Sequence, residues 1–231
     1  MNYIHRTLYK ALKQAAADGL VPRNTAATMR APRPCKKEIH PLDRAQIKAL
    51  LREARCERLE VIYVVAAHCG LRQGELLGLR WEDVDVDTGK LPVRRTLSYV
   101  TKAPVFNSPK NGKGRALNLT ETAVEALKRH KATQNEERLR LGGLWEYNGL
   151  VFPGLTGQPM RPWSLTGGPF KRLLKQAGLP EKTRFHDLRH TCATLLLSEG
   201  VHPKFVQELL GHATIVITLD TYSHVLPGMG N

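Results

Sequence analysis

Apolar positions along the chain recur mostly at helical spacing. Over residues 4–18 they lie three to four apart, which predicts one amphipathic helix that ends before Gly19 and Pro22. Residues 21–34 hold three prolines and three arginines and predict an extended basic linker, with a domain boundary near residue 35. A single helix cannot bury its own apolar face, so we expect residues 1–35 to be the end of a preceding domain.

From Pro41 onward the pattern predicts a mainly helical domain, residues 36–231. Asp43 and Gln46 have the spacing of a capping box. Residues 59–68 are apolar on nearly every side and predict a buried helix that ends at Gly70. Further helices are expected from residue 122 to about 139, and at 168–177, 187–199, 203–210 and 216–224; the 168–177, 187–199 and 203–210 helices are followed by Gly178, Gly200 and Gly211.

Two segments depart from helical spacing. Residues 91–119 alternate β-branched and aromatic residues with prolines and contain the Asn111-Gly112 dipeptide, which predicts a small antiparallel sheet with a cationic turn near residues 110–114. The glycine-rich segment 142–168 is expected to be a long surface connection with little regular structure. The fold class is therefore mainly α with a small antiparallel sheet (α+β).

The charge balance points to a polyanionic partner. Lys and Arg number 35 against 21 Asp and Glu, a net charge of +14, which favours nucleic-acid binding that weakens with salt; a basic surface kept for solubility is the alternative. The longest apolar run, Val61–Ala67, is far shorter than the roughly 20 residues that cross a bilayer, and no signal-peptide pattern opens the chain, so we expect a cytoplasmic location.

The cysteines do not suggest a metal or redox site. The chain has four, with no CxxC pair among them: Cys35, Cys56, Cys69 and Cys192. His186 and His190 are spaced to share one face of a helix, but no acidic or Cys ligand stands at a zinc-like spacing beside them. We therefore expect no metal and no other cofactor.

Three pairs of residues carry candidate chemistry. His186 and Arg189 lie three apart on a predicted helix, where an imidazole and a guanidinium fork suit a phosphate, although a solvated helix face is the commoner meaning of this spacing. Arg72 and Glu75 are also three apart, and the carboxylate orients the guanidinium or forms an ordinary exposed ion pair.

The third pair is His212 and Tyr222. They are ten residues apart, so a short helix between them brings an imidazole near a phenol. Taken singly, Tyr222 is more often a packing residue and His212 a helix-end cap.

The order of these residues along the chain and the sequence motifs around them resemble the tyrosine recombinase family, specifically the integrases of phages and integrative elements. The resemblance covers about 190 residues from Pro41 and lies in four phrases: GLRQGELLGLRWEDVD (70–85), SPKNGKGRALNL (108–119), FHDLRHTCAT (185–194) and LLGHATIVITLDTYSHV (209–225). The opening helix and linker resemble the end of the core-binding domain that precedes the catalytic domain in such integrases.

Position by position, the resemblance implies the following roles. Arg72 and Arg189 clamp the scissile phosphate, and Lys110 protonates the leaving 5′ oxygen. His186 and His212 complete the pocket, with His186 the expected proton-transfer partner of the nucleophile Tyr222. Glu75 matches an acidic position that supports the site, and Lys113, on the same turn as Lys110, is an alternative to it.

The implied reaction is site-specific DNA recombination through a 3′-phosphotyrosyl intermediate, without metal or nucleotide. The implied partners are double-stranded attachment sites bound by a homotetramer, with accessory bending or directionality proteins. Val216 and Ile217 stand where the family often has small hydroxylic residues, and many relatives continue beyond the position of Asn231 into a helix that docks on a neighbour. A type IB topoisomerase, a non-cleaving DNA-binding protein and a metal-dependent nuclease are the competing interpretations; the nuclease lacks the acidic cluster it needs.

Overall fold

The fold is known from a computed structural model that describes residues 2–30, 39–109 and 114–225. The chain divides into two compact units, Met1–Glu38 and Ile39–Asn231. Each unit is described by itself.

The first unit is a helix followed by a short turn. Helix α1 spans Asn2–Ala17, in line with the predicted amphipathic helix. A 3₁₀ turn, Thr25–Ala27, follows, and its capping residue Asn24 accepts from the Ala26 amide and donates from Nδ2 to the Tyr9 carbonyl at 3.0 Å. Part of the expected extended linker therefore folds back on the helix; residues 31–38 lie outside the described part of the chain.

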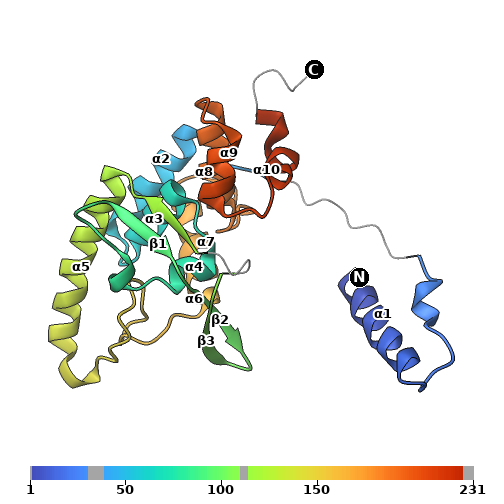
Figure 1. The fold of residues 1–231 in the computed structure, drawn as a ribbon. Helices are drawn as coiled ribbons and strands as arrows, with labels where there is room; N and C mark the ends of the chain where they lie inside the picture. Colours follow the sequence, from blue (N-terminus) through green and yellow to red (C-terminus); the bar gives the residue numbers. More distant parts are fainter. Residues whose placement is uncertain (1, 31–38, 110–113, 226–231) are drawn as a thin grey trace. The chain divides into compact units, whose positions relative to one another are not determined.

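The second unit is mainly helical, with two small sheets (Figure 1). Figure 1 shows α5 along one edge of this unit, with α8, α9 and α10 gathered at the opposite edge. Its helices and strands are α2 (Arg44–Glu53), α3 (Glu60–Cys69), α4 (Gln73–Leu77), β1 (Lys90–Val93), β2 (Thr96–Val100), β3 (Ala103–Asn107), β4 (Arg115–Asn118), α5 (Glu121–Leu141), α6 (Pro162–Thr166), α7 (Gly168–Gln176), α8 (Asp187–Ser198), α9 (Pro203–Leu210) and α10 (Ile215–Tyr222).

Helix α3 is the centre of the core. Eight of its ten residues are buried, as its all-round apolar pattern predicts. At the start of the neighbouring helix α2, Asp43 and Gln46 form the predicted capping box. Gly70 ends α3 in the left-handed conformation, with φ of 58°. This left-handed turn favours glycine, and a Cβ there would lie 2.8 Å from Leu210 Cδ2, so any other residue would also displace the Leu210 side chain of α9.

The predicted sheet is two separate antiparallel pairs. Strand β1 pairs with β4, and β2 pairs with β3. The β2–β3 turn falls at Thr101 and Lys102, which both have positive φ, so β2 folds back on its own neighbour instead of extending the β1–β4 pair. A cationic turn is expected near residues 110–114, and residues 110–113 of that segment lie outside the described part.

Two other expectations are corrected. Helix α5 begins one residue before Thr122, because Thr120 has the extended backbone of an N-cap and its hydroxyl accepts from the Ala123 amide. Segment 142–168 is not only a surface connection: it includes α6 and several buried residues, namely Leu150, Val151, Phe152, Met160 and Leu165.

Within the described ranges, no helix combines the length and the apolar character that a membrane crossing needs.

Candidate phosphate-binding active site

The described site residues come from three places that packing brings together. Helix α8 contacts both α3 and α9, and α9 also contacts β4 and α10 (Figure 1). Segments far apart in the sequence thereby meet at one edge of the unit. The predicted residues there are Arg72 and Glu75 at α4, His186 and Arg189 at the start of α8, and His212 and Tyr222 around α10.

Arg72 and Glu75 form the first part of the site. Arg72 is the N-cap of α4, and its amide donates to Glu75 Oε2 while its Nη1 donates to Glu75 Oε1, both at 2.9 Å. Glu75 is only 2% exposed, so this is not an ordinary surface ion pair. Its carboxylate fixes the direction of a guanidinium that keeps about a third of its side chain, 34%, open to solvent.

Arg115 is a further site residue that the sequence analysis missed. It opens β4, and its Nη1 and Nη2 donate to the two oxygens of Glu75 at 3.0 and 2.7 Å. Burial alone would raise the pKa of Glu75, but the hydrogen bond and charge of Arg115, together with Arg72, lower it to about 2. Glu75 is therefore ionised between two arginines. The only sequence signal for Arg115 was its place in the SPKNGKGRALNL phrase, after the predicted turn.

The C-terminal end of α9 holds all three arginines of the site. Its successive carbonyls Leu209, Leu210 and Gly211 accept from Arg115 Nε at 2.8 Å, Arg189 Nη2 at 2.5 Å and Arg72 Nη2 at 3.3 Å, respectively. The last carbonyls of a helix lack partners within it and form the negative end of its dipole. The helix end thus provides fixed acceptors that orient three guanidinium groups toward one place.

Arg189 is the most buried of these cations. It is 3% exposed, and its Nη1 donates to the carbonyl of Gly70 at 2.7 Å. Burial, and then the charge of Arg72, lower the pKa of Arg189 to about 9, so it remains charged at neutral pH. Three guanidinium groups and one carboxylate, that of Glu75, leave excess positive charge at the site, which suits an anion with several oxygens, such as a phosphate.

His212 follows directly after this helix end. Its carbonyl accepts from Gln207 Nε2 at 2.7 Å, and its Nδ1 is 2.9 Å from the hydroxyl of the buried Thr218. Burial, followed by the charges of Arg189 and Arg72, lowers the pKa of His212 to about 4. The imidazole is therefore uncharged at neutral pH, with its orientation set by α10.

The unusual residues at the start of α10 do not disturb this contact. Val216 and Ile217 are 56% and 43% exposed, whereas Thr218 is fully buried. The two apolar side chains face solvent, and the hydroxyl that follows them faces His212.

Tyr222 is the last residue of α10 and is 1% exposed. It packs with four apolar residues of α8 and α9: Ala193, Leu197, Val206 and Leu210. Burial raises the pKa of Tyr222 well above its ordinary value, and the opposing influence of Arg189 is smaller. The phenol is therefore protonated in this state, with the Arg189 charge close enough to act on it.

The hydrogen-bond partner of the Tyr222 hydroxyl is His190. Its Nδ1 lies 2.7 Å from the hydroxyl oxygen, and the two ring centroids are 5.8 Å apart. The family resemblance implies His186 in this relation, and the sequence spacing presents His190 only as a candidate metal ligand beside His186. His186, one turn earlier, packs edge-on against the His190 ring at 5.0 Å between centroids and is itself exposed.

Lys110 and its alternative Lys113 fall in residues 110–113, outside the described residues. Among the residues that the structure describes, no three His, Cys, Asp or Glu side chains converge as a metal site would require.

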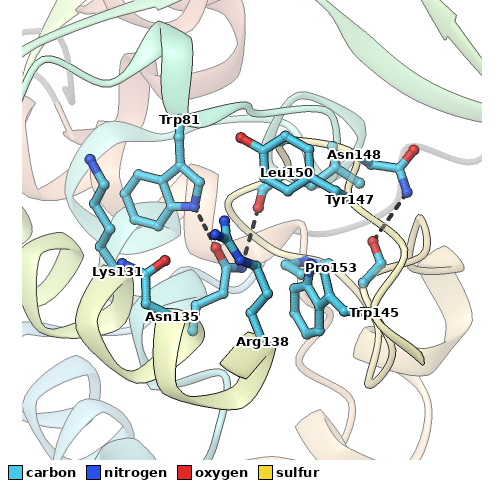
Figure 2. Close-up of a pocket in the computed structure, with 12 residues that line it drawn as sticks. Trp81, Lys131, Asn135, Arg138, Trp145, Tyr147, Asn148, Leu150 and Pro153 are labelled. Carbon is cyan, nitrogen blue, oxygen red and sulfur yellow. Dashed lines mark hydrogen bonds between the residues drawn. The ribbon is translucent and has the colours of Figure 1, made fainter. Parts of the chain in front are cut away.

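A pocket of about 210 Å³ lies elsewhere, between α5 and the segment 145–157 (Figure 2). Trp81, Trp145 and Tyr147 line it, and Trp81 Nε1 hydrogen-bonds to Gln134. None of the predicted site residues lines this pocket, so we assign the pocket no part in the candidate phosphate-binding site.

Comparison with known proteins identifies the family. The profile of the Phage integrase family matches residues 41–228. A tyrosine recombinase XerC-like protein of Caldanaerobacter subterraneus is 34% identical over 203 residues, which are 82% of this chain and 51% of that protein. Prophage integrase IntR of Escherichia coli K12 is 30% identical, over 83% of this chain and 49% of its own length. The chain thus spans about half the length of these relatives.

A solved structure is also similar to this chain. The Tn1549 transposon integrase in complex with transposon right end DNA superposes with a TM-score of 0.79 at 25% identity, covering 96% of this chain and 74% of that one.

Proposed function

Because the chain belongs to the Phage integrase family, we propose that it cuts and rejoins double-stranded DNA at specific sites as a tyrosine recombinase of a phage or other mobile element. The observation that carries the proposal is the meeting of Arg72, Arg115 and Arg189 at the end of α9, beside a buried tyrosine. Such a cluster supplies fixed positive potential where a phosphodiester gains negative charge in its transition state.

In this proposal, Arg72 and Arg189 each bind non-bridging oxygens of the scissile phosphate. Both guanidinium groups are already held by main-chain carbonyls, so they need little reorganisation when the phosphate arrives. His186 and His212 complete the phosphate pocket. Glu75 and Arg115 position Arg72 without contacting the substrate.

The chemical step joins Tyr222 to DNA. The phenolic oxygen attacks phosphorus, the bond to the 5′ oxygen breaks, and a 3′-phosphotyrosyl ester forms while Lys110 protonates the leaving oxygen. The ester conserves the energy of the phosphodiester, so a 5′ hydroxyl from a partner duplex can reverse the reaction. The proposed steps use neither a nucleotide nor a metal ion.

The proposed partners follow from this reaction. Exchange of strands between two duplexes requires four cleavage events, so we propose a homotetramer on two attachment sites, aided by accessory bending or directionality proteins. We also propose that residues 1–35 are the end of a core-binding domain. The net charge of +14 supports a polyanionic substrate bound mainly through its backbone.

The test uses DNA junctions that flank the gene, prepared as nicked duplexes that trap the covalent product. Incubation with a chelator is expected to yield a protein–DNA adduct with the wild-type chain and none with Tyr222→Phe. Full cleavage by Tyr222→Phe, or strict dependence on magnesium, contradicts the proposal. Relaxation of supercoiled plasmids that lack the junctions favours a topoisomerase instead.

A further inference from the structure

Tyr222 and His190 form a buried pair. The distance of 2.7 Å between the hydroxyl oxygen and Nδ1 is that of a good hydrogen bond, and Tyr222 is 1% exposed. Among the described residues, His190 is the only hydrogen-bond partner of this hydroxyl. A buried hydroxyl needs an acceptor for its proton, which indicates that Tyr222 donates and Nδ1 accepts.

The charge state of the His190 ring agrees with a hydrogen bond that Tyr222 donates to Nδ1. Burial, followed by the nearby His186, lowers the pKa of His190 to about 4, so the imidazole is uncharged at neutral pH. The other charged groups acting on it are Asp187, which favours the imidazolium, and Arg189 and Arg184, which oppose it. An uncharged imidazole has one ring nitrogen free to accept a proton.

His186 is placed for a different task. Its side chain is exposed, and within the described part of the chain it has no hydrogen-bond partner, whereas its ring edge contacts the His190 ring. It is therefore accessible to a phosphate oxygen entering the site, while His190 lies behind it against the tyrosine.

We propose that His190 is a catalytic residue that accepts the hydroxyl proton of Tyr222 during cleavage. This inference rests on the proposed function. As the phenolic oxygen bonds to phosphorus, its proton moves to His190 Nδ1, the bond from phosphorus to the 5′ oxygen breaks, and that oxygen takes its proton from Lys110. On rejoining, the incoming 5′ hydroxyl gives up its proton to Lys110, and the His190 imidazolium returns its proton to the departing Tyr222 oxygen.

The test measures the single-turnover rate of adduct formation on the nicked duplexes, with DNA binding measured in parallel by gel shift. His190→Ala removes the acceptor and is expected to slow the reaction by roughly 100-fold or more with binding unchanged. His190→Asn places an amide near the position of Nδ1, where it can hold the hydroxyl but cannot take the proton. We expect Asn to be within about fivefold of Ala. Recovery by Asn to near the wild-type rate overturns proton transfer.

A second substrate separates the two ends of the reaction. When sulfur replaces the bridging 5′ oxygen, the leaving thiolate needs no proton, so a defect in the leaving-group acid disappears. The His190→Ala defect is expected to persist on this substrate, because the loss is on the nucleophile side. Its disappearance would assign His190 to the leaving group and overturn the inference.

Ser198→Ala, at the exposed end of the same helix, is the matched control and is expected to react at the wild-type rate. The outcomes also separate this inference from the proposed function. An adduct that forms with Tyr222→Phe contradicts the function itself. A wild-type adduct at Tyr222, formed equally fast by His190→Ala, contradicts only the role of His190.

Discussion

Arg115 and Glu75 form a two-bonded ion pair that joins strand β4 to helix α4, with N–O distances of 3.0 and 2.7 Å. The side chains are 12% and 1% exposed, so the pair is largely removed from water. Arg115 also binds the Leu209 carbonyl at the end of α9. The Arg115 side chain thereby connects three elements: strand β4, which carries it, helix α4 through Glu75, and the C-terminal end of helix α9.

Replacing Arg115 should destabilise the fold. Arg115→Ala leaves the buried Glu75 carboxylate with Arg72 as its remaining cation, and breaking a buried pair in this way costs about 3 kcal/mol. We expect the free energy of unfolding in urea to fall by about that amount. Arg172→Ala, which breaks an exposed pair with Glu57, is the matched control and should cost at most about 1 kcal/mol. Equal losses in the two variants would show that the Arg115 pair is energetically ordinary.

Replacing Gly211 should disturb the arginines as well as the backbone. Gly211 has φ of 64°, and a Cβ there would lie 3.0 Å from Arg115 Nη1. Gly178 has nearly the same φ, 67°, with nothing within 4 Å of its Cβ position, so Gly178→Ala isolates the backbone cost. Each variant should lose about 1 kcal/mol from the left-handed backbone. Only Gly211→Ala should also slow adduct formation, and equal rates in the two variants would contradict the role of this close approach.

Acid should remove the contribution of Glu75 to stability. Its pKa falls from 4.5 when unfolded to about 2 when folded, so the contribution is complete above about pH 4.5 and is lost as the pH falls toward 2. Glu75→Gln cannot ionise. The difference in unfolding free energy between wild type and Glu75→Gln should therefore shrink across that interval. A difference that stays constant from pH 5 to pH 2.5 is the contrary result.

Thr218→Val should affect catalysis more than stability. It removes the hydroxyl that holds His212 Nδ1 while keeping nearly the same volume, and a lost hydrogen bond of this kind costs about 1 kcal/mol. We expect adduct formation to slow by roughly tenfold as the imidazole loses its orientation. Thr221→Val is the control, because Thr221 lies on the same helix, is only partly buried, and donates its hydroxyl to the Ile217 carbonyl of that helix, not to a site residue. If the two variants react equally fast, the His212–Thr218 contact has no part in the reaction.

Removing an arginine that we propose to bind the phosphate should reduce cleavage much more than DNA affinity. Arg72→Ala is expected to abolish adduct formation and to change DNA binding by less than about tenfold, because many other Lys and Arg side chains supply backbone contacts. Gel shifts and cleavage assays run on the same duplex provide the comparison. Parallel losses would assign Arg72 to affinity alone.

The sequence predicted what local patterning controls. The apolar run of α3, its end at Gly70 and the glycine stops after α7, α8 and α9 depend on residues close together in the chain, and all are present. The separate β2–β3 pair was missed because Thr101 and Lys102 are unusual residues for positive φ. The sequence predicts a surface location for residues 150–152, whereas the structure buries them, because their burial depends on packing against distant elements.

At the site, too, residues in local motifs are predicted from the sequence, whereas contacts between distant segments are not. The spacing and the family resemblance predicted Arg72, Glu75, His186, Arg189, His212 and Tyr222, and the structure brings these residues to one edge of the second unit. They did not single out Arg115, which acts across 40 residues of sequence. Nor did they assign His190 to Tyr222, since the choice between two histidines one turn apart depends on where α10 packs.

The most direct test of the account is mass spectrometry of the protease-digested adduct. Wild-type protein trapped on a nicked junction duplex in the presence of a chelator should yield one nucleotide-bearing peptide, with the phosphate attached at Tyr222. Attachment at another residue, or recovery of cleaved DNA with no attached peptide, contradicts the central claim that Tyr222 is the nucleophile.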